Sequence, residues 1–121
     1  MQQIQIPPLA EGEVYLCGLV DANGDVTHTI LLPAENDPAP WQEQMDWAKS
    51  IGADLPTRAE LVMAYEKHRD LFQKRGYWSN TPDDDPEYVG WAWYQYFSDG
   101  GQYDTAQLFK LRARAVRRLS I

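Results

Sequence analysis

The sequence predicts an α+β fold made of an N-terminal β-hairpin, two helices and an antiparallel sheet. Three observations support this prediction. Asn23-Gly24 separates two segments rich in β-forming residues, Thr57 and Glu60 have the spacing of a helix capping box, and side chains alternate in character over residues 90–98. With 121 residues the chain has the length of one domain, and we expect residues 1–121 to fold as a single unit.

The hairpin is expected over residues 13–33, on either side of Asn23-Gly24. An Asn-Gly pair accepts the positive φ that a tight hairpin turn requires. The returning segment alternates between two faces, as a half-buried strand does. Three prolines follow within residues 33–40, and they predict an irregular crossing loop.

Two helices are expected, at about residues 40–51 and 58–73. In the second helix the Thr57 hydroxyl can accept from the backbone N–H of Glu60, while the Glu60 carboxylate accepts from that of Thr57. In each segment, mostly apolar residues recur at helical spacing along one face. They are Trp41, Met45 and Ala48 in the first helix, and Leu61, Tyr65, His68 and Phe72 in the second.

The sheet is expected over residues 77–119, with an acidic loop at residues 81–88 and a turn at residues 99–101. The strand at 90–98 alternates between two sets of side chains. One set is Trp91, Trp93, Gln95 and Phe97, and the other is Ala92, Tyr94, Tyr96 and Ser98. If the first set faces the core, the second faces solvent or a partner.

Composition excludes several classes of function. The chain carries 18 acidic and 11 basic side chains, for a formal net charge of −7, so binding to nucleic acid is not expected. Cys17 is the only cysteine, so no internal disulfide can form. The N-terminus lacks the features of a signal peptide, and no stretch approaches the roughly 20 apolar residues of a membrane span. We therefore expect cytoplasmic synthesis and no membrane insertion.

Four segments in fixed order resemble a known bacterial and phage domain. They are Leu55-Pro56-Thr57-Arg58-Ala59-Glu60-Leu61, Tyr77-Trp78-Ser79-Asn80-Thr81, Ala92-Trp93-Tyr94-Gln95-Tyr96-Phe97-Ser98-Asp99-Gly100 and Arg114-Ala115-Val116-Arg117. The resemblance is to the Lcl C-terminal-like domain, a short domain of unknown function in the C-type-lectin-fold and formylglycine-generating-enzyme-like superfamily. It implies a C-type-lectin-like fold, with two helices packed on a twisted antiparallel sheet. It also implies a role in adhesion or receptor binding, and with it association with a virion. Gln95 departs from the family pattern, which has an apolar inward residue there, so this strand is expected to be more open.

No enzyme is expected, because the sequence shows no nucleophile–base pair. Cys17 lies within an apolar strand, and neither His28 nor His68 has an evident Ser or Cys partner. The formylglycine-generating branch of the resemblance uses a late pair of cysteines, which this chain lacks. The acidic side chains of residues 81–88 could supply oxygen ligands to Ca²⁺, but a solvated loop explains them better, because their spacing matches no EF-hand. No cofactor is therefore expected.

Partner binding is assigned to aromatic side chains at the end of the sheet and in its loops. Tyr and Trp offer rigid contact area at low entropic cost, although the same residues could simply cover a thin core. The assigned residues are Tyr88, Trp91, Tyr94, Tyr96 and Tyr103. Thr57, Glu60, Arg114 and Arg117 are assigned structural roles, with Asp99 or Glu60 as a carboxylate partner for the arginines.

The sequence thus predicts a non-enzymatic binding module of phage, prophage or bacterial origin that recognises a protein or glycan partner. Two alternatives remain open at this stage. One is a structural protein that forms homo-oligomers through the same aromatic face. The other is a small acidic inhibitor of a host nucleic-acid-binding protein, whose carboxylates imitate phosphate charge.

Overall fold

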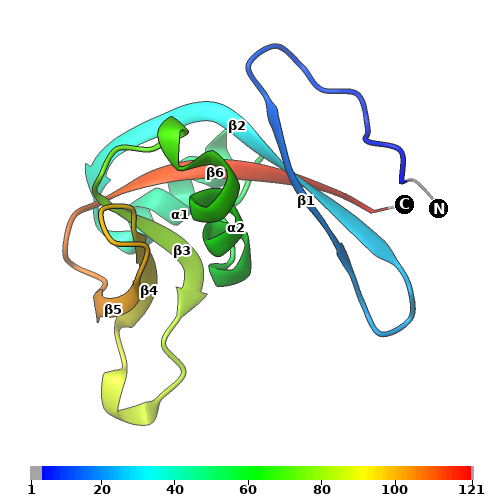
Figure 1. Ribbon diagram of the computed structural model, residues 1–121. Coiled ribbons are helices and arrows are strands. Elements are labelled where there is room, and N and C mark those ends of the chain that lie inside the picture. Colours follow the sequence, from blue (N-terminus) through cyan, green and yellow to red (C-terminus); the bar gives the residue numbers. More distant parts are fainter. Residues whose placement is uncertain (1–3, 121) are drawn as a thin grey trace.

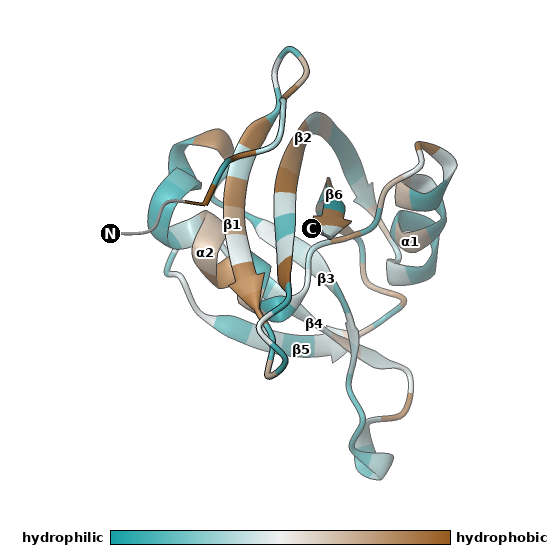
Figure 2. Cartoon of the chain, turned by 90° about the vertical axis from the view of Figure 1, so that its right-hand side faces the viewer, coloured by the Kyte–Doolittle hydropathy of each residue, from teal (hydrophilic) through white to brown (hydrophobic). Residues whose placement is uncertain are grey.

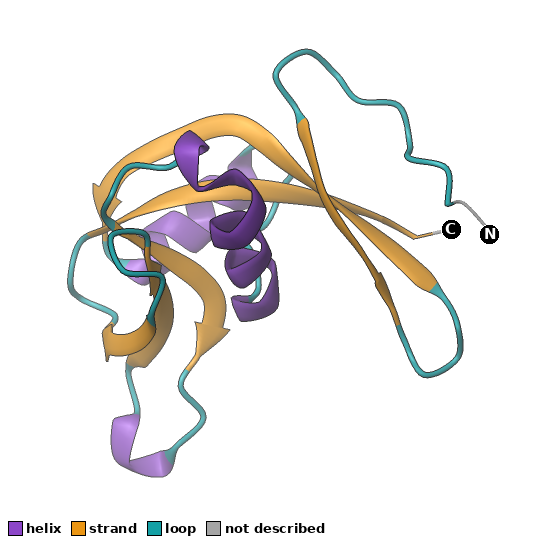
Figure 3. Ribbon diagram, in the orientation of Figure 1, coloured by secondary structure: helices purple, strands orange, loops and turns teal. Residues whose placement is uncertain are grey.

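The computed structural model describes residues 4–120 and contains six strands and two α-helices within that range (Figures 1 and 3). The strands are β1 (Val14–Val20), β2 (Val26–Ala39), β3 (Gly76–Pro82), β4 (Trp91–Tyr96), β5 (Gln102–Ala106) and β6 (Leu111–Ser120). The helices are α1 (Trp41–Ser50) and α2 (Arg58–His68), with short 3-10 turns at η1 (Arg69–Leu71) and η2 (Pro86–Tyr88). None of these helices has the length and hydrophobicity required to span a membrane. The predicted α+β class, with two helices on a sheet, is confirmed.

The strands form one sheet in the order β1-β2-β6-β3-β4-β5. Neighbouring strands are antiparallel except β3 and β6, which run parallel through the pairing of Tyr77 with Arg112. The prediction of a purely antiparallel sheet is therefore wrong. β6 does not extend the β3–β5 meander at its end but enters between that meander and the N-terminal hairpin, which gives it a parallel neighbour on one side.

β2 continues through the segment for which the prolines predict an irregular loop. Its register with β6 shifts twice, and Pro33 lies in the first shift and Pro38 in the second. A proline cannot donate to a strand ladder, but a bulge leaves residues unpaired. The prediction of a loop at residues 33–40 is wrong because the two irregularities accommodate Pro33 and Pro38 within one long strand, which ends just before Pro40.

The two helices cover opposite faces of the sheet (Figure 2). Successive side chains of β3 show this division, as the alternation of a strand requires. Tyr77 packs in the core on the α2 side with Leu61 and Ala64, while Trp78 packs in the core on the α1 side with Ala48. The central strands are consequently buried from both faces.

α2 begins at the predicted capping box, which is confirmed. The Glu60 N–H donates to the Thr57 hydroxyl at 3.1 Å, and the Thr57 N–H donates to the Glu60 carboxylate at 2.8 Å. The helix ends at His68, so the predicted extension to residue 73 is wrong. Phe72 follows η1 with extended backbone, and its ring stacks on Phe97 with centroids 4.1 Å apart. The apolar spacing of the sequence therefore continues past the end of α2, because Phe72 packs in the same core as the helix although its own backbone is extended.

The Glu60 carboxylate also joins α2 to β2 and β6. Glu60 is 1% exposed and accepts from the Thr29 hydroxyl at 2.6 Å and from two nitrogens of the Arg118 guanidinium at 2.7 and 2.9 Å. Asp54 is a second carboxylate on Arg118, at 2.7 Å. Burial alone would raise the pKa of Glu60, but the hydrogen bonds from Arg118, Thr29 and the Thr57 N–H outweigh burial and hold this pKa below its usual value.

Arg114 and Arg117 both tie β6 to segments that are distant in sequence. Arg117 forms an ion pair with Glu13 at 2.8 Å. Arg114 is 8% exposed and binds no carboxylate of residues 4–120. Its guanidinium donates instead to the backbone carbonyls of Leu32 and Leu71, each at 2.7 Å. Desolvation accordingly lowers the pKa of Arg114.

The predicted partners of these two arginines, Asp99 or Glu60, are wrong. Glu60 is occupied by Arg118, and Asp99 lies in the turn after β4. The ion-pairing arginines that the sequence reasoning missed are Arg118 and Arg112, which pairs with Glu35 at 2.8 Å. Alternation places Arg112, Arg114 and Arg118 on one side of β6, but it does not indicate which of them meets a carboxylate.

The buried carboxylate can be tested by Glu60→Gln, which keeps the shape of the side chain and removes its charge. We expect the free energy of unfolding to fall by about 3 kcal/mol, at the low end of the range for broken buried pairs because Arg118 retains Asp54. Chemical denaturation measures this loss. Glu66→Gln is the matched control, because Glu66 lies 4.0 Å from Arg69 on the exposed side of α2 and should change stability by less than about 0.5 kcal/mol. Equal effects at the two positions would contradict a central role for Glu60.

Candidate functional site

Three tyrosines lie on the side of β4 and β5 that α1 leaves open. Tyr94 pairs directly with Tyr103 across the two strands, with ring centroids 5.9 Å apart. Tyr96 lies two residues further along β4 and therefore on the same side. Because α1 packs mainly on β2, β3 and β6 (Figure 2), Tyr103 remains 44% exposed and Tyr96 37% exposed. We call Tyr94, Tyr96 and Tyr103 the tyrosine face.

Tyr94 anchors the tyrosine face to the core. Its ring meets that of Trp78 edge-on, with centroids 6.2 Å apart, and it is half-buried. It also covers Gly76 of β3, where an added Cβ would lie 3.2 Å from the Tyr94 ring. The ring therefore lies close against the backbone of the neighbouring strand, and burial raises the pKa of Tyr94.

Tyr103 is held by the turn between β4 and β5. Its hydroxyl donates to Asp99 at 2.8 Å, and the other oxygen of the Asp99 carboxylate accepts from the Gly101 N–H at 2.8 Å. These two hydrogen bonds lower the pKa of Asp99, and the bond to Asp99 raises the pKa of Tyr103. An exposed ring whose orientation is already fixed loses little conformational entropy when it binds a partner.

A small cavity of about 110 Å³ borders the tyrosine face where β3 and β6 begin. Gly76 and Leu111 line it, and Leu111 lies beside Gly76, the glycine that Tyr94 covers. The cavity also receives the basic side chains Arg75 and Lys110. The region thus combines aromatic surface, cationic donors and the Asp99 carboxylate, which are groups suited to contact and hydrogen bonding.

Tyr88 and Trp91 form a second and separate aromatic pair. Their rings meet edge-on with centroids 5.1 Å apart, beside the η2 turn that projects from the body of the molecule (Figure 1). Trp91 is an odd-numbered residue of β4 and so points away from the side that carries Tyr94 and Tyr96. The five residues predicted to form one site therefore fall into two groups.

The simple division of β4 into a core side and a solvent side is wrong. Ala92, on the same side as the tyrosine face, is fully buried, whereas Trp93 on the other side is half-buried beneath the Arg58 guanidinium, 3.7 Å from its ring centroid. Gln95 does not open the strand. It is fully buried, donates to a backbone carbonyl of the β4–β5 turn at 2.6 Å and accepts from Gln102 at 3.0 Å. Both sides of β4 contain core because a helix lies on each face of the sheet.

The acidic loop uses its carboxylates to fix its own backbone. Asp83 accepts from the Asp85 N–H at 2.9 Å, and Asp85 accepts from the Glu87 N–H at 3.0 Å. Asp83 also faces Asp104 on β5, and a hydrogen bond between the two carboxyls, formed while Asp104 is protonated, raises the pKa of Asp104 and lowers that of Asp83. Across the described range 4–120, no group of three or more His, Cys, Asp or Glu is arranged to hold a metal ion.

Cys17 lies buried in β1, and desolvation by burial raises the pKa of its thiol. A thiol that stays protonated is a weak nucleophile, because the thiolate is the reactive form. Its environment is that of a small apolar side chain in a core. The tyrosine face and the loops beside it are thus the strongest candidate site on the described chain.

The contact between the acidic loop and β5 should depend on pH. Asp104 donates to Asp83 only while it carries its proton, so this hydrogen bond is lost as pH rises through the raised pKa of Asp104. Asp83→Asn removes the neighbouring negative charge, and we expect the pKa of Asp104 to fall. Carboxyl ¹³C NMR across the acid range measures this pKa. Asp84→Asn, in the same loop, should leave the titration of Asp104 unchanged, and an unchanged titration in Asp83→Asn would show that the two carboxyls do not meet in solution.

Comparison with known proteins gives no relative from which a function could be transferred. No protein-family model matches the chain, and a search of curated proteins finds no significant match. A functional assignment consequently depends on the geometry of the site.

Proposed function

We propose that this protein is a non-enzymatic binding module that recognises a protein or glycan partner through the tyrosine face. The observation that carries this proposal is the placement of Tyr96 and Tyr103, which are exposed and flank Tyr94 on the side of the sheet that α1 does not cover. Tyrosine provides apolar area and a hydroxyl in one rigid side chain, so it is enriched where proteins bind partners.

The surroundings of the tyrosine face also favour binding. Asp99 fixes Tyr103 before any partner arrives, and Arg75 and Lys110 stand beside the small cavity that adjoins Tyr94. Hydroxyl groups of a glycan, or polar groups of a protein, would find both donors and acceptors there. Buried Cys17 gives no support to a nucleophilic reaction.

We further propose that the fold is C-type-lectin-like and that the protein is of phage, prophage or bacterial origin, as the four sequence segments imply. Two features support the fold assignment. The helices lie on opposite faces of one sheet, and the two ends of the described chain meet, since Ile4 and Ser120 line the same cavity. The chain would then use the end of its sheet as the receptor-binding surface.

The proposal predicts that Tyr96→Ala and Tyr103→Ala, combined, remove partner binding while the thermal midpoint changes by only a few degrees. Both side chains are more than one-third exposed, so their truncation leaves little cavity. Binding is measured on a glycan array and by affinity capture from bacterial lysate, with the captured protein then purified and titrated. Tyr88→Ala is the matched control, because Tyr88 is 40% exposed but lies in the separate pair with Trp91.

Retained binding in the double variant would contradict the assignment of the tyrosine face. Sedimentation velocity tests the alternative in which the same face joins copies of this chain. A stable homo-oligomer that the double variant converts to monomer would favour the assembly alternative over a separate partner.

A further inference from the structure

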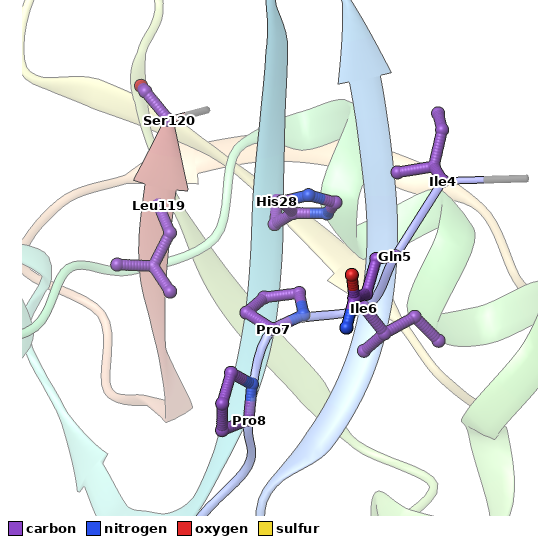
Figure 4. Close-up of a pocket in the computed structure, with 8 residues that line it drawn as sticks. All are labelled: Ile4, Gln5, Ile6, Pro7, Pro8, His28, Leu119 and Ser120. Carbon is purple, nitrogen blue, oxygen red and sulfur yellow. The ribbon is translucent and has the colours of Figure 1, made fainter.

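A cavity of about 620 Å³ lies between the N-terminal segment and the far end of the β2–β6 pair (Figure 4). Residues 4–8, which we call the arm, form one wall, while His28 of β2 and Leu119 of β6 lie opposite. The volume is within the range of small-molecule sites, about 300–1,000 Å³. The cavity lies beside β2 and β6, whereas the tyrosine face lies on β4 and β5, so the two are separate features.

His28 supplies an unpartnered polar atom at this cavity. The residue is 2% exposed, its Nδ1 is hydrogen-bonded to the Tyr15 hydroxyl, and its Nε2 is buried without a partner in the described range. A phenol donates more readily than it accepts, and the unprotonated nitrogen of imidazole is a good acceptor. We therefore assign Tyr15 as the donor to Nδ1, which places the ring proton on Nε2. Figure 4 shows the ring turned toward the arm.

This buried N–H restricts what can fill the cavity. A buried donor without an acceptor is destabilising, because it has lost its hydrogen bonds to water. A water molecule would remove that cost only if two to four polar groups held it, and most of the lining consists of Ile, Pro and Leu side chains. None of the described lining residues is Asp, Glu, Lys or Arg, so these residues offer no counter-charge to an ionic ligand group.

The arm is attached in a way that allows it to move. Residues 4–7 make no hydrogen bond to any other described residue, so apolar contact alone holds them over His28. The next residues are fixed, because Arg117 donates to the Pro8 carbonyl at 3.3 Å and binds Glu13, whose carboxylate accepts from the Ala10 N–H at 2.7 Å. A small shift of residues 4–7 about this fixed point would open the shielded Nε2 to a ligand.

We propose that this cavity binds a small uncharged molecule with an apolar body and one acceptor oxygen, a carbonyl or a hydroxyl. The oxygen accepts from Nε2–H of His28, and the apolar body packs against Ile4, Ile6 and Leu119. The arm closes over the bound molecule. This site does not depend on the tyrosine face, and its ligand is distinct from the partner proposed for that surface.

The test uses indanone and indane, which share a bicyclic skeleton and differ by the ketone oxygen. Each is titrated into the ¹⁵N-labelled full chain while the side-chain nitrogens of His28 and the backbone amides of Ile4, Ile6 and Leu119 are followed by NMR. Indanone is expected to give saturating shifts of these amides and of His28 Nε2, and indane is expected to leave Nε2 unmoved. Both titrations are repeated with Tyr15→Phe, His28→Phe, a double variant that removes the donor without leaving a Tyr15 hydroxyl unpaired.

The ratio of indanone affinity to indane affinity should be roughly threefold to tenfold higher in the wild type than in the double variant, as one net hydrogen bond predicts. Val89→Ser, at an exposed apolar position in another loop, should leave this ratio unchanged. Absence of saturating shifts with indanone overturns the proposal, and so does an equal ratio in the wild type and the double variant. If the double variant does not fold, the wild-type comparison still decides, because identical responses of Nε2 to both probes also overturn the proposal.

Discussion

The arrangement of this molecule depends on one buried carboxylate. Glu60 closes the first turn of α2, accepts from Thr29 on β2 and binds Arg118 on β6. A buried charge is tolerated only where its partners are all in place. α2 therefore has a single favourable position on the sheet. In that position the Glu60 carboxylate both caps α2 and neutralises Arg118 of β6. The second core then forms on the opposite face, where α1 packs against Trp78.

Coverage of both faces by helices decides where a partner can bind. The central strands are enclosed, and the tyrosine face stays accessible on β4 and β5, near one edge of the sheet. The tyrosine face lies just beyond the part of the sheet that α1 covers, and its three side chains differ in how firmly their contacts fix them. Tyr94 is part of the core edge, Tyr103 is fixed through Asp99, and Tyr96 is limited only by its strand. The tyrosine face thus combines side chains that their contacts hold in place with one that is free to adjust to a partner.

Local signals in the sequence predicted local structure well. Asn23-Gly24 and the Thr57–Glu60 box mark the hairpin and the start of α2, because turn and cap chemistry acts over a few residues. Features that depend on contacts between distant segments could not be predicted in the same way. The path of β2 past Pro33 depends on its register with β6, and the partner of Arg114 depends on carbonyls far along the chain. The site shows the same limit: alternation placed Tyr94 and Tyr96 together, but the opposite side of β4 was not simply core, because a helix covers each face.

The position of β6 has a consequence for how the chain folds during synthesis. The hairpin of β1 and β2 and the meander of β3 to β5 are both complete by Ala106, yet they meet in the sheet only through β6, which follows them in sequence. Until residues 111–120 leave the ribosome, the inner edges of β2 and β3 remain unpaired, and exposed strand edges are templates for aggregation. The sheet therefore cannot be completed before its central strand is synthesised, and a chaperone that shields these edges would protect the nascent chain until then.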